Sequence, residues 1–303
     1  MAEPNYVLRP AKAVQRRMVV DACRRLTAVG PLDQFQYVGF GGLEYVDIEM
    51  VHRALGVRKM VSIEKTVGQQ PRFEFNIPFA GVQLLMGESN DQLANIDWFP
   101  LSIVWLDYTV KLTPSVLRDV EYVVRSACPG SLLLVSINAE PENPGSERGE
   151  KLTEQLKDYA PAGYDSSSLS GSWGWAAAQR AVLQNVATRA SREARGGGFR
   201  QLFNFNYADN AKMQTWGGAI TAPNVERVLD DCRFGDLDFI RQGDEPFKVK
   251  VPILTQREVR YLETKLPASS GKPGCRRPCR CRWSDASERC RVRRSADVRA
   301  GRR

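Results

Sequence analysis

The stretch Tyr37-Val-Gly-Phe-Gly-Gly42 decides the fold, because it is a short apolar strand that runs straight into a glycine-rich turn. The predicted strand covers residues 36–40, and a predicted helix over residues 45–55 follows. Glycines allow the chain to turn sharply and leave the backbone open to a ligand. The predicted turn residues are Gly39, Gly41 and Gly42, with Phe40 between them. A unit of this kind predicts an α/β protein whose ligand lies at the carboxyl ends of its strands.

Apolar strands and helices alternate on the C-terminal side of this turn. Four more strands are predicted over residues 59–64, 82–86, 101–107 and 131–138. Their spacing of roughly 20 to 30 residues leaves room for a crossover helix between parallel neighbours. Thr113 is the expected N-cap of a helix over residues 114–127, and an amphipathic helix over residues 11–28 precedes the sheet. The pattern predicts a parallel sheet covered on both faces.

The pattern changes after Asn138. Residues 139–172 are rich in Pro, Gly, Ser and Glu and are predicted to be a long mobile connection, and a helix over residues 173–195 follows. Two β-type runs, 200–207 and 213–221, are joined by a short polar segment that predicts a hairpin. This order predicts a Rossmann-like class I methyltransferase fold, with a mostly parallel seven-stranded sheet and a C-terminal antiparallel hairpin. The expected division is a helical segment at 1–35, the α/β domain at 36–267 and a tail at 268–303.

Polar residues are predicted at the ends of the second and third strands. Glu64 follows Gly42 by 22 positions, where a carboxylate can accept hydrogen bonds from ribose hydroxyls. The alternative is a surface carboxylate that pairs with Lys65 or Arg58. Glu88 and Ser89 end the third strand, where a polar side chain can meet an adenine amine. With the glycine turn, these residues predict an adenosine-containing cofactor.

Asp107 and Tyr108 end the fourth strand, at the same edge of the sheet. Asp107 is predicted to take the proton of a methyl acceptor or to anchor it, and it is also counted among the cofactor contacts. Tyr108 is predicted to line the acceptor pocket. The Asp-Tyr pair differs from the Asn-Pro-Pro-Tyr motif of nucleobase-directed enzymes, which disfavours such substrates. Asp107 and Asn138, even with Glu140, are a poor ligand set, so no metal is predicted.

Other polar and aromatic residues have competing interpretations. Arg72 and Asn76 lie among aromatics in a segment that suits either a substrate-pocket wall or a packing cluster. His52, the sole histidine, is predicted to be structural. Trp173, Trp175 and Trp216 are predicted to be core residues. The basic side chains of the first helix, Lys12, Arg16 and Arg17, are predicted to form a solvated face, with contact to an anionic acceptor as the alternative.

Several of these motifs together resemble a bacterial family of O-methyltransferases. The resemblance rests on YVLRPAK at 6–12, GFGG at 39–42, HRALG at 52–56, SIE at 62–64, RFEFNIPF at 72–79 and VWLDY at 104–108. It covers roughly residues 5 to 265 and leaves out the tail. It implies a class I methyltransferase fold with S-adenosylmethionine as cofactor, and it names no substrate.

Charge is distributed unevenly along the 303 residues, whose net charge is +8. Residues 268–303 hold twelve basic and three acidic residues, so the tail carries +9 and the rest of the chain −1. A nearly neutral body does not favour a nucleic-acid substrate, and the tail predicts only weak attachment to nucleic acid. Its four cysteines lack the paired C-x2-C spacing of common zinc sites. The tail is therefore predicted to be disordered.

The remaining features bound the compartment and the function. No apolar stretch approaches the roughly 20 residues of a membrane helix, and no export signal is visible, so a cytoplasmic location is expected. Cys23, Cys128 and Cys232 are predicted to be reduced core residues. The predicted function is S-adenosylmethionine-dependent, O-directed methyl transfer to a small or peptide-like acceptor, with no membrane partner. The alternatives are a nicotinamide-dependent oxidoreductase and a non-catalytic cofactor-binding module.

Overall fold

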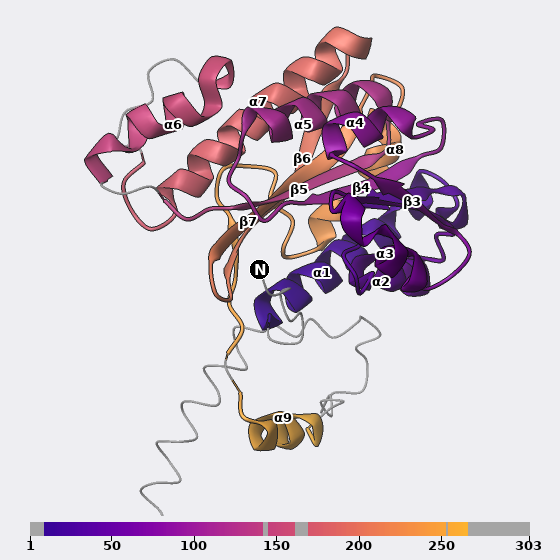
Figure 1. Cartoon of the computed structure of the whole chain (residues 1–303). Coiled ribbons are helices and arrows are strands. Elements are labelled where there is room, and N and C mark those ends of the chain that lie inside the picture. The colour runs from indigo at the N-terminus through magenta and orange to yellow at the C-terminus, as the bar shows by residue number, and fades with distance from the viewer. Residues whose placement is uncertain (1–8, 142–144, 161–168, 253, 266–303) are drawn as a thin grey trace, which may run out of the picture. The chain divides into compact units, whose positions relative to one another are not determined.

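The computed structural model describes residues 9–141, 145–160, 169–252 and 254–265 (Figure 1). The chain divides into two compact units, Met1–Val249 and Lys250–Arg303. In the second unit the described part holds helix α9 (Gln256–Glu263). Thr255 begins this helix with a capping box. Its side chain accepts a hydrogen bond from the backbone amide of Glu258, and the Glu258 carboxylate accepts one from the backbone amide of Thr255. The predicted tail at 268–303 lies outside the described residues.

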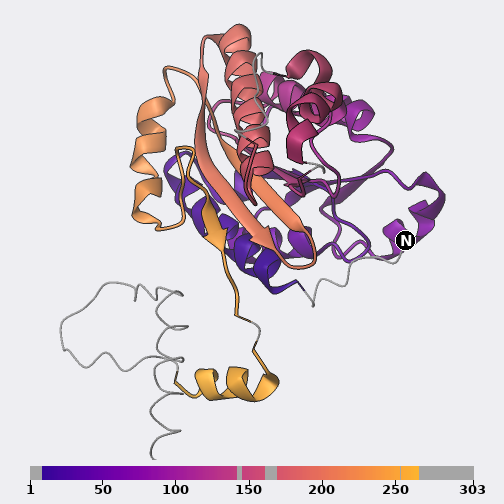
Figure 2. The ribbon, with the colours of Figure 1, turned by 90° about the vertical axis from the view of Figure 1, so that its left-hand side faces the viewer.

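The first unit is built on one sheet, which lies between its helices in Figure 2. The strand order of this sheet is β3-β2-β1-β4-β5-β7-β6-β8. The strands are β1 (Gln36–Gly39), β2 (Lys59–Glu64), β3 (Val82–Met86), β4 (Ser102–Asp107), β5 (Leu132–Asn138), β6 (Gly198–Ala208), β7 (Lys212–Thr221) and β8 (Phe247–Val249). The first five are mutually parallel, and β7 lies antiparallel between β5 and β6. The five predicted parallel strands and the predicted antiparallel hairpin are confirmed, with ends within two residues.

The predicted strand number is wrong, because the sheet has eight strands and not seven. The eighth, β8, pairs parallel with β6 through Phe205 and Phe247 and the two following positions. It has three residues and follows a polar segment, so it shows no alternation long enough to be read from sequence.

The helices of the first unit are α1 (Pro10–Cys23), α2 (Val46–Leu55), α3 (Gln70–Phe75), α4 (Ser89–Gln92), α5 (Pro114–Ser126), α6 (Arg148–Leu156), α7 (Gly174–Arg195) and α8 (Glu226–Asp231). The predicted first helix is α-helical only to Cys23 and then continues as a 3-10 helix, Arg24–Ala28. The predicted irregular connection over residues 139–172 contains α6, whose Leu152 and Leu156 are buried. Leu152 and Leu156 are four residues apart and therefore share one helix face, which is a signal for an amphipathic helix. The polar composition of the segment around them instead favours a long connection in the prediction.

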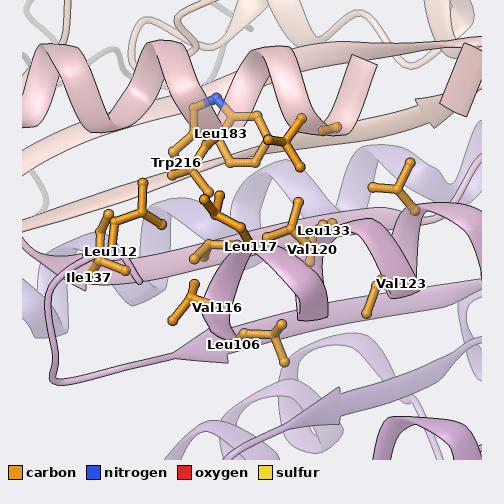
Figure 3. Packing of buried hydrophobic residues seen from close by; sticks show 14 of the residues in the cluster. Leu106, Leu112, Val116, Leu117, Val120, Val123, Leu133, Ile137, Leu183 and Trp216 are labelled. Carbon is orange, nitrogen blue, oxygen red and sulfur yellow. The ribbon is translucent and has the colours of Figure 1, made fainter. Parts of the chain in front are cut away.

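One face of the sheet carries the main apolar core (Figure 3). Helices α5 and α7 cover this face, and alternate residues of the central strands point into it, among them Leu106, Leu133 and Ile137. Trp175 and Trp216 are fully buried there, as predicted, whereas Trp173 is only half-buried. Trp216 stacks on Phe199 at 4.8 Å between ring centroids.

The opposite face, which α1 contacts, is more polar where the strands reach their carboxyl ends. Within the described ranges, the chain has no helix with the length and hydropathy to cross a membrane.

Candidate functional site

The glycine turn after β1 is shaped by contacts within the protein. Gly42 has φ of +60°, in the left-handed region that favours glycine. A Cβ on Gly41 would lie 2.6 Å from Ser62 Oγ and 2.7 Å from the Tyr45 ring. A Cβ on Gly39 would lie 2.8 Å from the Tyr37 hydroxyl and 2.9 Å from the Trp105 carbonyl. The two glycines are therefore needed for close packing of β1 against β2, α2 and β4.

Glu64, the last residue of β2, holds its carboxylate against this turn. Its Oε1 accepts from the Gly42 amide at 2.8 Å and from the Ser62 hydroxyl at 3.0 Å. Ser62 Oγ in turn accepts from the Gly41 amide at 3.1 Å. Glu64 is only 8% exposed. The glycine turn and the acidic residue predicted to act with it are thus joined directly.

The end of β3 lies beside these groups through the backbone, since the Gly87 amide donates to the Glu64 carbonyl at 2.9 Å. Glu88 follows as an exposed residue at the start of α4. Ser89 instead donates from its hydroxyl to Asp119 of α5, at 2.5 Å. The structure therefore places Glu88 in solvent and ties Ser89 to α5.

Asp119 collects several polar side chains and was not singled out from the sequence. Besides Ser89, Asn90 and the Tyr108 hydroxyl donate to its carboxylate. Burial raises the pKa of Asp119 in spite of these bonds, and burial together with Asp119 raises the pKa of Tyr108 well above its ordinary value. A sequence signal existed, because Asp119 interrupts the apolar stripe of α5 made by Val116, Val120 and Val123.

Tyr108 and Asp107 point to opposite faces of the sheet. Tyr108 reaches toward α5 and meets the Phe40 ring edge to face, with the centroids 5.0 Å apart. Asp107 reaches toward α1, where its Oδ1 accepts from Lys12 Nζ at 2.6 Å. The carboxyl edge of β1 and β4 is therefore flanked by an aromatic pair on one side and an ion pair on the other.

The Lys12–Asp107 ion pair sits among hydroxyl groups of three further strands. Lys12 Nζ also donates to Tyr207 Oη at 3.2 Å and to Ser136 Oγ at 3.3 Å. Ser136 accepts from the Trp105 indole at 3.0 Å and bonds Thr215 Oγ1 at 2.8 Å. The strand register explains the gathering, since Asp107, Ser136 and Thr215 are direct neighbours across β4, β5 and β7.

A second buried ion pair lies one helical turn further along α1. Arg16 donates from Nε to Asp47 Oδ1 at 2.5 Å and from a terminal nitrogen to Oδ2 at 3.2 Å. The predicted solvated face is therefore wrong for Lys12 and Arg16, each 4% exposed, while Arg17 is exposed. Lys12 and Arg16 are four residues apart, on the helix face that also buries Val19 and Cys23.

Burial and charge act against each other on the Lys12–Asp107 pair. Burial raises the pKa of Asp107, but the charges of Lys12 and Arg16 and the bonds from Lys12 and Ser136 outweigh it, so the pKa is lowered overall. For Lys12 burial lowers the pKa, yet the neighbouring acidic groups, Asp107 foremost, raise it overall. Both shifts favour the charged forms, so the pair is ionised at neutral pH.

The other predicted site residues lie apart from this edge. Arg72 and Asn76 are exposed on and after α3, where the Asn76 amide donates to the Arg72 carbonyl at 2.9 Å. His52 bonds the Val57 carbonyl through Nδ1 at 2.7 Å and stacks on Phe79.

The residues weighed as metal ligands are engaged with the backbone. Asn138 Oδ1 accepts from the Glu140 amide at 2.8 Å, and Glu140 Oε1 accepts from the Lys212 amide at 2.8 Å. In the part of the chain that the structure describes, no three His, Cys, Asp or Glu side chains form a metal-binding group.

Three of the solved structures that are similar to this chain are named as methyltransferases, and all three have low sequence identity to it. The S-adenosylmethionine-dependent methyltransferase SibL in its apo form is 11% identical (TM-score 0.38), with 69% of this chain and 55% of that chain covered. Human N-acetylserotonin methyltransferase in complex with its cofactor is 16% identical (TM-score 0.35; 71% and 56% covered). A sarcosine dimethylglycine methyltransferase from Galdieria sulphuraria, itself named as putative, is 11% identical (TM-score 0.43; 67% and 85% covered). The chain thus spans little more than half the length of the first two, and no curated protein matches it.

The model of one protein family covers most of the sequence. The family is described as "Putative O-methyltransferase", and its model matches residues 4–286. The match reaches further into the basic tail than the resemblance noted from the motifs, which ended near residue 265. The predicted fold class is confirmed and agrees with this family, since five parallel strands are followed by an antiparallel strand inserted beside β5. The chain belongs to this O-methyltransferase family and has the Rossmann-like fold of class I S-adenosylmethionine-dependent methyltransferases.

Proposed function

We propose that this chain transfers a methyl group from S-adenosylmethionine to an oxygen of a small or peptide-like acceptor, at the carboxyl edge of β1, β2 and β4. The observation that carries the proposal is the buried Glu64 carboxylate held against the glycine turn by Gly42 and Ser62. Membership of a methyltransferase family supports the class of reaction and its cofactor.

The residues at the turn suit the adenosine part of this cofactor. A carboxylate at the end of the second strand offers acceptor oxygens for the two ribose hydroxyls, which are hydrogen-bond donors. Gly39, Gly41 and Gly42 keep the turn close to the sheet, and Phe40 offers an apolar ring beside it. Glu88 is the proposed contact for the adenine amine. Ser89 is proposed to act through its bond to Asp119, which fixes the start of α4.

The bound cofactor would supply a methyl group already activated by a positive sulfur, so the protein has to align the acceptor and exclude water. Asp107 is the proposed partner of the acceptor hydroxyl, because it ends β4 and keeps 18% of its side chain exposed. Tyr108, packed on Phe40, is the proposed wall on the other side. Arg72 and Asn76 are proposed only as outer contacts, since Arg72 is exposed on α3 and Asn76 is exposed directly after it.

A nicotinamide-dependent oxidoreductase is the weaker alternative. A sheet of that class would continue with parallel crossovers, whereas β7 is antiparallel to β5. Titration calorimetry with S-adenosylmethionine, S-adenosylhomocysteine and NAD distinguishes the two. Binding of the first two without NAD is expected, and binding of NAD alone would overturn the proposal.

A variant at Glu64 tests the position of the cofactor. Glu64→Gln keeps the shape but removes the charge, and we expect cofactor affinity to fall at least tenfold, within the roughly 1.5–3 kcal/mol of a hydrogen bond to a charged group. Lys65→Ala is the matched control, because Lys65 is the exposed neighbour in the chain. Equal affinities in the two variants would remove the cofactor from this edge.

The transfer itself is measured with methyl-labelled cofactor and three probes: a simple phenol, a hydroxy acid and a serine-containing peptide. Labelled product is expected with a hydroxyl acceptor. Tight cofactor binding without label in any probe, even with the protein at the same concentration as the probe, would favour the non-catalytic module.

A further inference from the structure

The strongest unexplained feature outside the cofactor residues is a lysine ammonium buried beneath α1. Lys12 has three N–H donors, and the structure gives three acceptors: Asp107 Oδ1, Tyr207 Oη and Ser136 Oγ. Its nitrogen also lies 4.9 Å from the centroid of the Trp105 ring. The ammonium is therefore held from β4, β5 and β6 at once.

Such a lysine is costly to keep for stability alone. Removing two charges from water costs several kcal/mol per ion, and apolar residues of similar volume often do as well or better. The face of α1 that carries Lys12 also buries the apolar side chains of Val19 and Cys23. A buried charged pair that reaches a functional edge of the sheet points to a role in the site.

The geometry shows which role Lys12 can take. The side chain of Lys12 is 5% exposed and its donors are engaged, whereas the side chain of Asp107 is 18% exposed at the end of β4. Lys12 therefore stands behind Asp107 and fixes the position of its carboxylate, while Asp107 remains the member of the pair that an acceptor reaches.

We propose that Lys12 is a positioning residue of the methyl-transfer site, which holds Asp107 as a fixed carboxylate for the hydroxyl of the acceptor. This inference rests on the proposed function, because it takes Asp107 as the group that meets the acceptor. It adds α1, an element before the nucleotide-binding sheet, to the acceptor end of the site.

The other charged and titratable groups around the pair come from four elements. Arg16 faces it from α1, Asp47 from α2, Tyr37 from β1 and Tyr207 from β6. Arg16 and Asp47 largely neutralise each other. Lys12 is thus the main cation that acts on Asp107. Without Lys12, the effect of burial, which raises the pKa of Asp107, is no longer offset.

The test compares Lys12→Met with Lys12→Arg, and uses Arg17→Met as the control on the exposed face of the same helix. The first readout is the titration of the Asp107 carboxyl, followed by ¹³C NMR in the ligand-free full chain. In Lys12→Met the midpoint should move to higher pH, and in Lys12→Arg and Arg17→Met it should stay near that of the wild type.

The second readout is the pH profile of kcat/KM for the acceptor that the label assay identifies. Lys12→Met should lower kcat/KM at neutral pH about 10²-fold, the scale of a misplaced reacting group, and move the acidic limb upward. The affinity for S-adenosylmethionine should change less than threefold. Lys12→Arg should restore part of the rate.

The outcomes separate this inference from the proposed function. If the wild type does not bind S-adenosylmethionine, the proposed function fails. If it binds the cofactor but the Asp107 midpoint or the acidic limb is unmoved in Lys12→Met, the positioning role is wrong. If Lys12→Met does not fold, Lys12→Gln takes its place in the titration of Asp107. The double variant Lys12→Met with Asp107→Asn, which lacks both charges, then shows whether the unpaired carboxylate caused the failure to fold.

Discussion

At the scale of single residues, the glycine turn shows that one residue type can serve packing and binding together. Gly41 is surrounded by Ser62 and Tyr45 at distances that no Cβ tolerates, so its absence of a side chain is required before any ligand arrives. The same turn presents the Gly42 amide to Glu64. A side chain added at Gly41 therefore disturbs the packing of the protein itself.

We predict that Gly41→Ala destabilises the protein by about 1–3 kcal/mol, the usual cost of overpacking a filled site. Gly68→Ala is the control, because nothing lies within 4 Å of a Cβ there. Thermal unfolding measures both. An unchanged melting temperature in Gly41→Ala would mean that Tyr45 and Ser62 move apart at no cost.

The Lys12–Asp107 pair predicts a specific dependence of stability on pH. Because the folded pKa of Asp107 is lowered, its contribution is present above the unfolded pKa and is lost as pH falls through the folded value. Because the folded pKa of Lys12 is raised, its contribution is present below the unfolded value and is lost as pH rises through the folded one. Denaturant unfolding from acid to alkaline pH should show both losses in the wild type and weaker ones in Lys12→Met. Identical profiles would refute the coupling.

At the scale of elements, the turn between β6 and β7 fixes the first helix. Asp209 in this turn accepts from the Ala11 amide at 2.9 Å and from the Lys12 amide at 3.1 Å. Pro10 at the first helical position has no N–H, and Arg9 makes no side-chain cap. A residue distant in sequence therefore supplies the cap of α1, and with it the register that places Lys12.

We expect Asp209→Ala to cost about 1 kcal/mol, the typical value of a lost N-cap. Asn210→Ala, one residue further in the same turn and exposed, should change stability by less than about 0.5 kcal/mol. Hydrogen exchange of the α1 amides shows whether the loss is local. Equal protection in both variants would assign no capping role to Asp209.

The sequence predicted the strands well and the contacts between distant residues poorly. The central strands were located to within two residues because each is a compact apolar run with turn residues around it. β8 and α6 were missed because they are short or embedded in polar sequence. Helical spacing shows which residues share a face, and from it Lys12 is predicted to face solvent. The carboxylate of Asp107, which allows the lysine to be buried by pairing with its charge, lies 95 positions away in the sequence.

At the scale of the whole molecule, the buried thiols report on the integrity of the first unit. Burial raises the pKa of Cys23 to about 12 and that of Cys232 to about 11, while Cys128 is half-buried. The prediction of three core cysteines is thus confirmed for Cys23 and Cys232 but not fully for Cys128.

We predict that iodoacetamide labels Cys128 in the native protein at neutral pH, and labels Cys23 and Cys232 only as fast as the unit unfolds. Thiolate is the reactive form, and burial suppresses both ionisation and access. Peptide mass mapping over a denaturant series distinguishes the sites. Labelling of Cys23 in native buffer at the rate of Cys128 would show that α1 opens independently of the sheet.

The cap that Asp209 gives to α1 has a consequence for how the protein is made. The bond from Ala11 spans 198 positions of the chain, so the helix that carries Lys12 cannot be capped until the β6–β7 turn has left the ribosome. Contacts of such separation are paid for in chain entropy before they return any stability, which slows folding. The five parallel strands β1 to β5 all precede this turn in the sequence, so they are synthesised before α1 can reach its cap. The first helix is therefore expected to be among the last elements to dock, after roughly the first two hundred residues are synthesised.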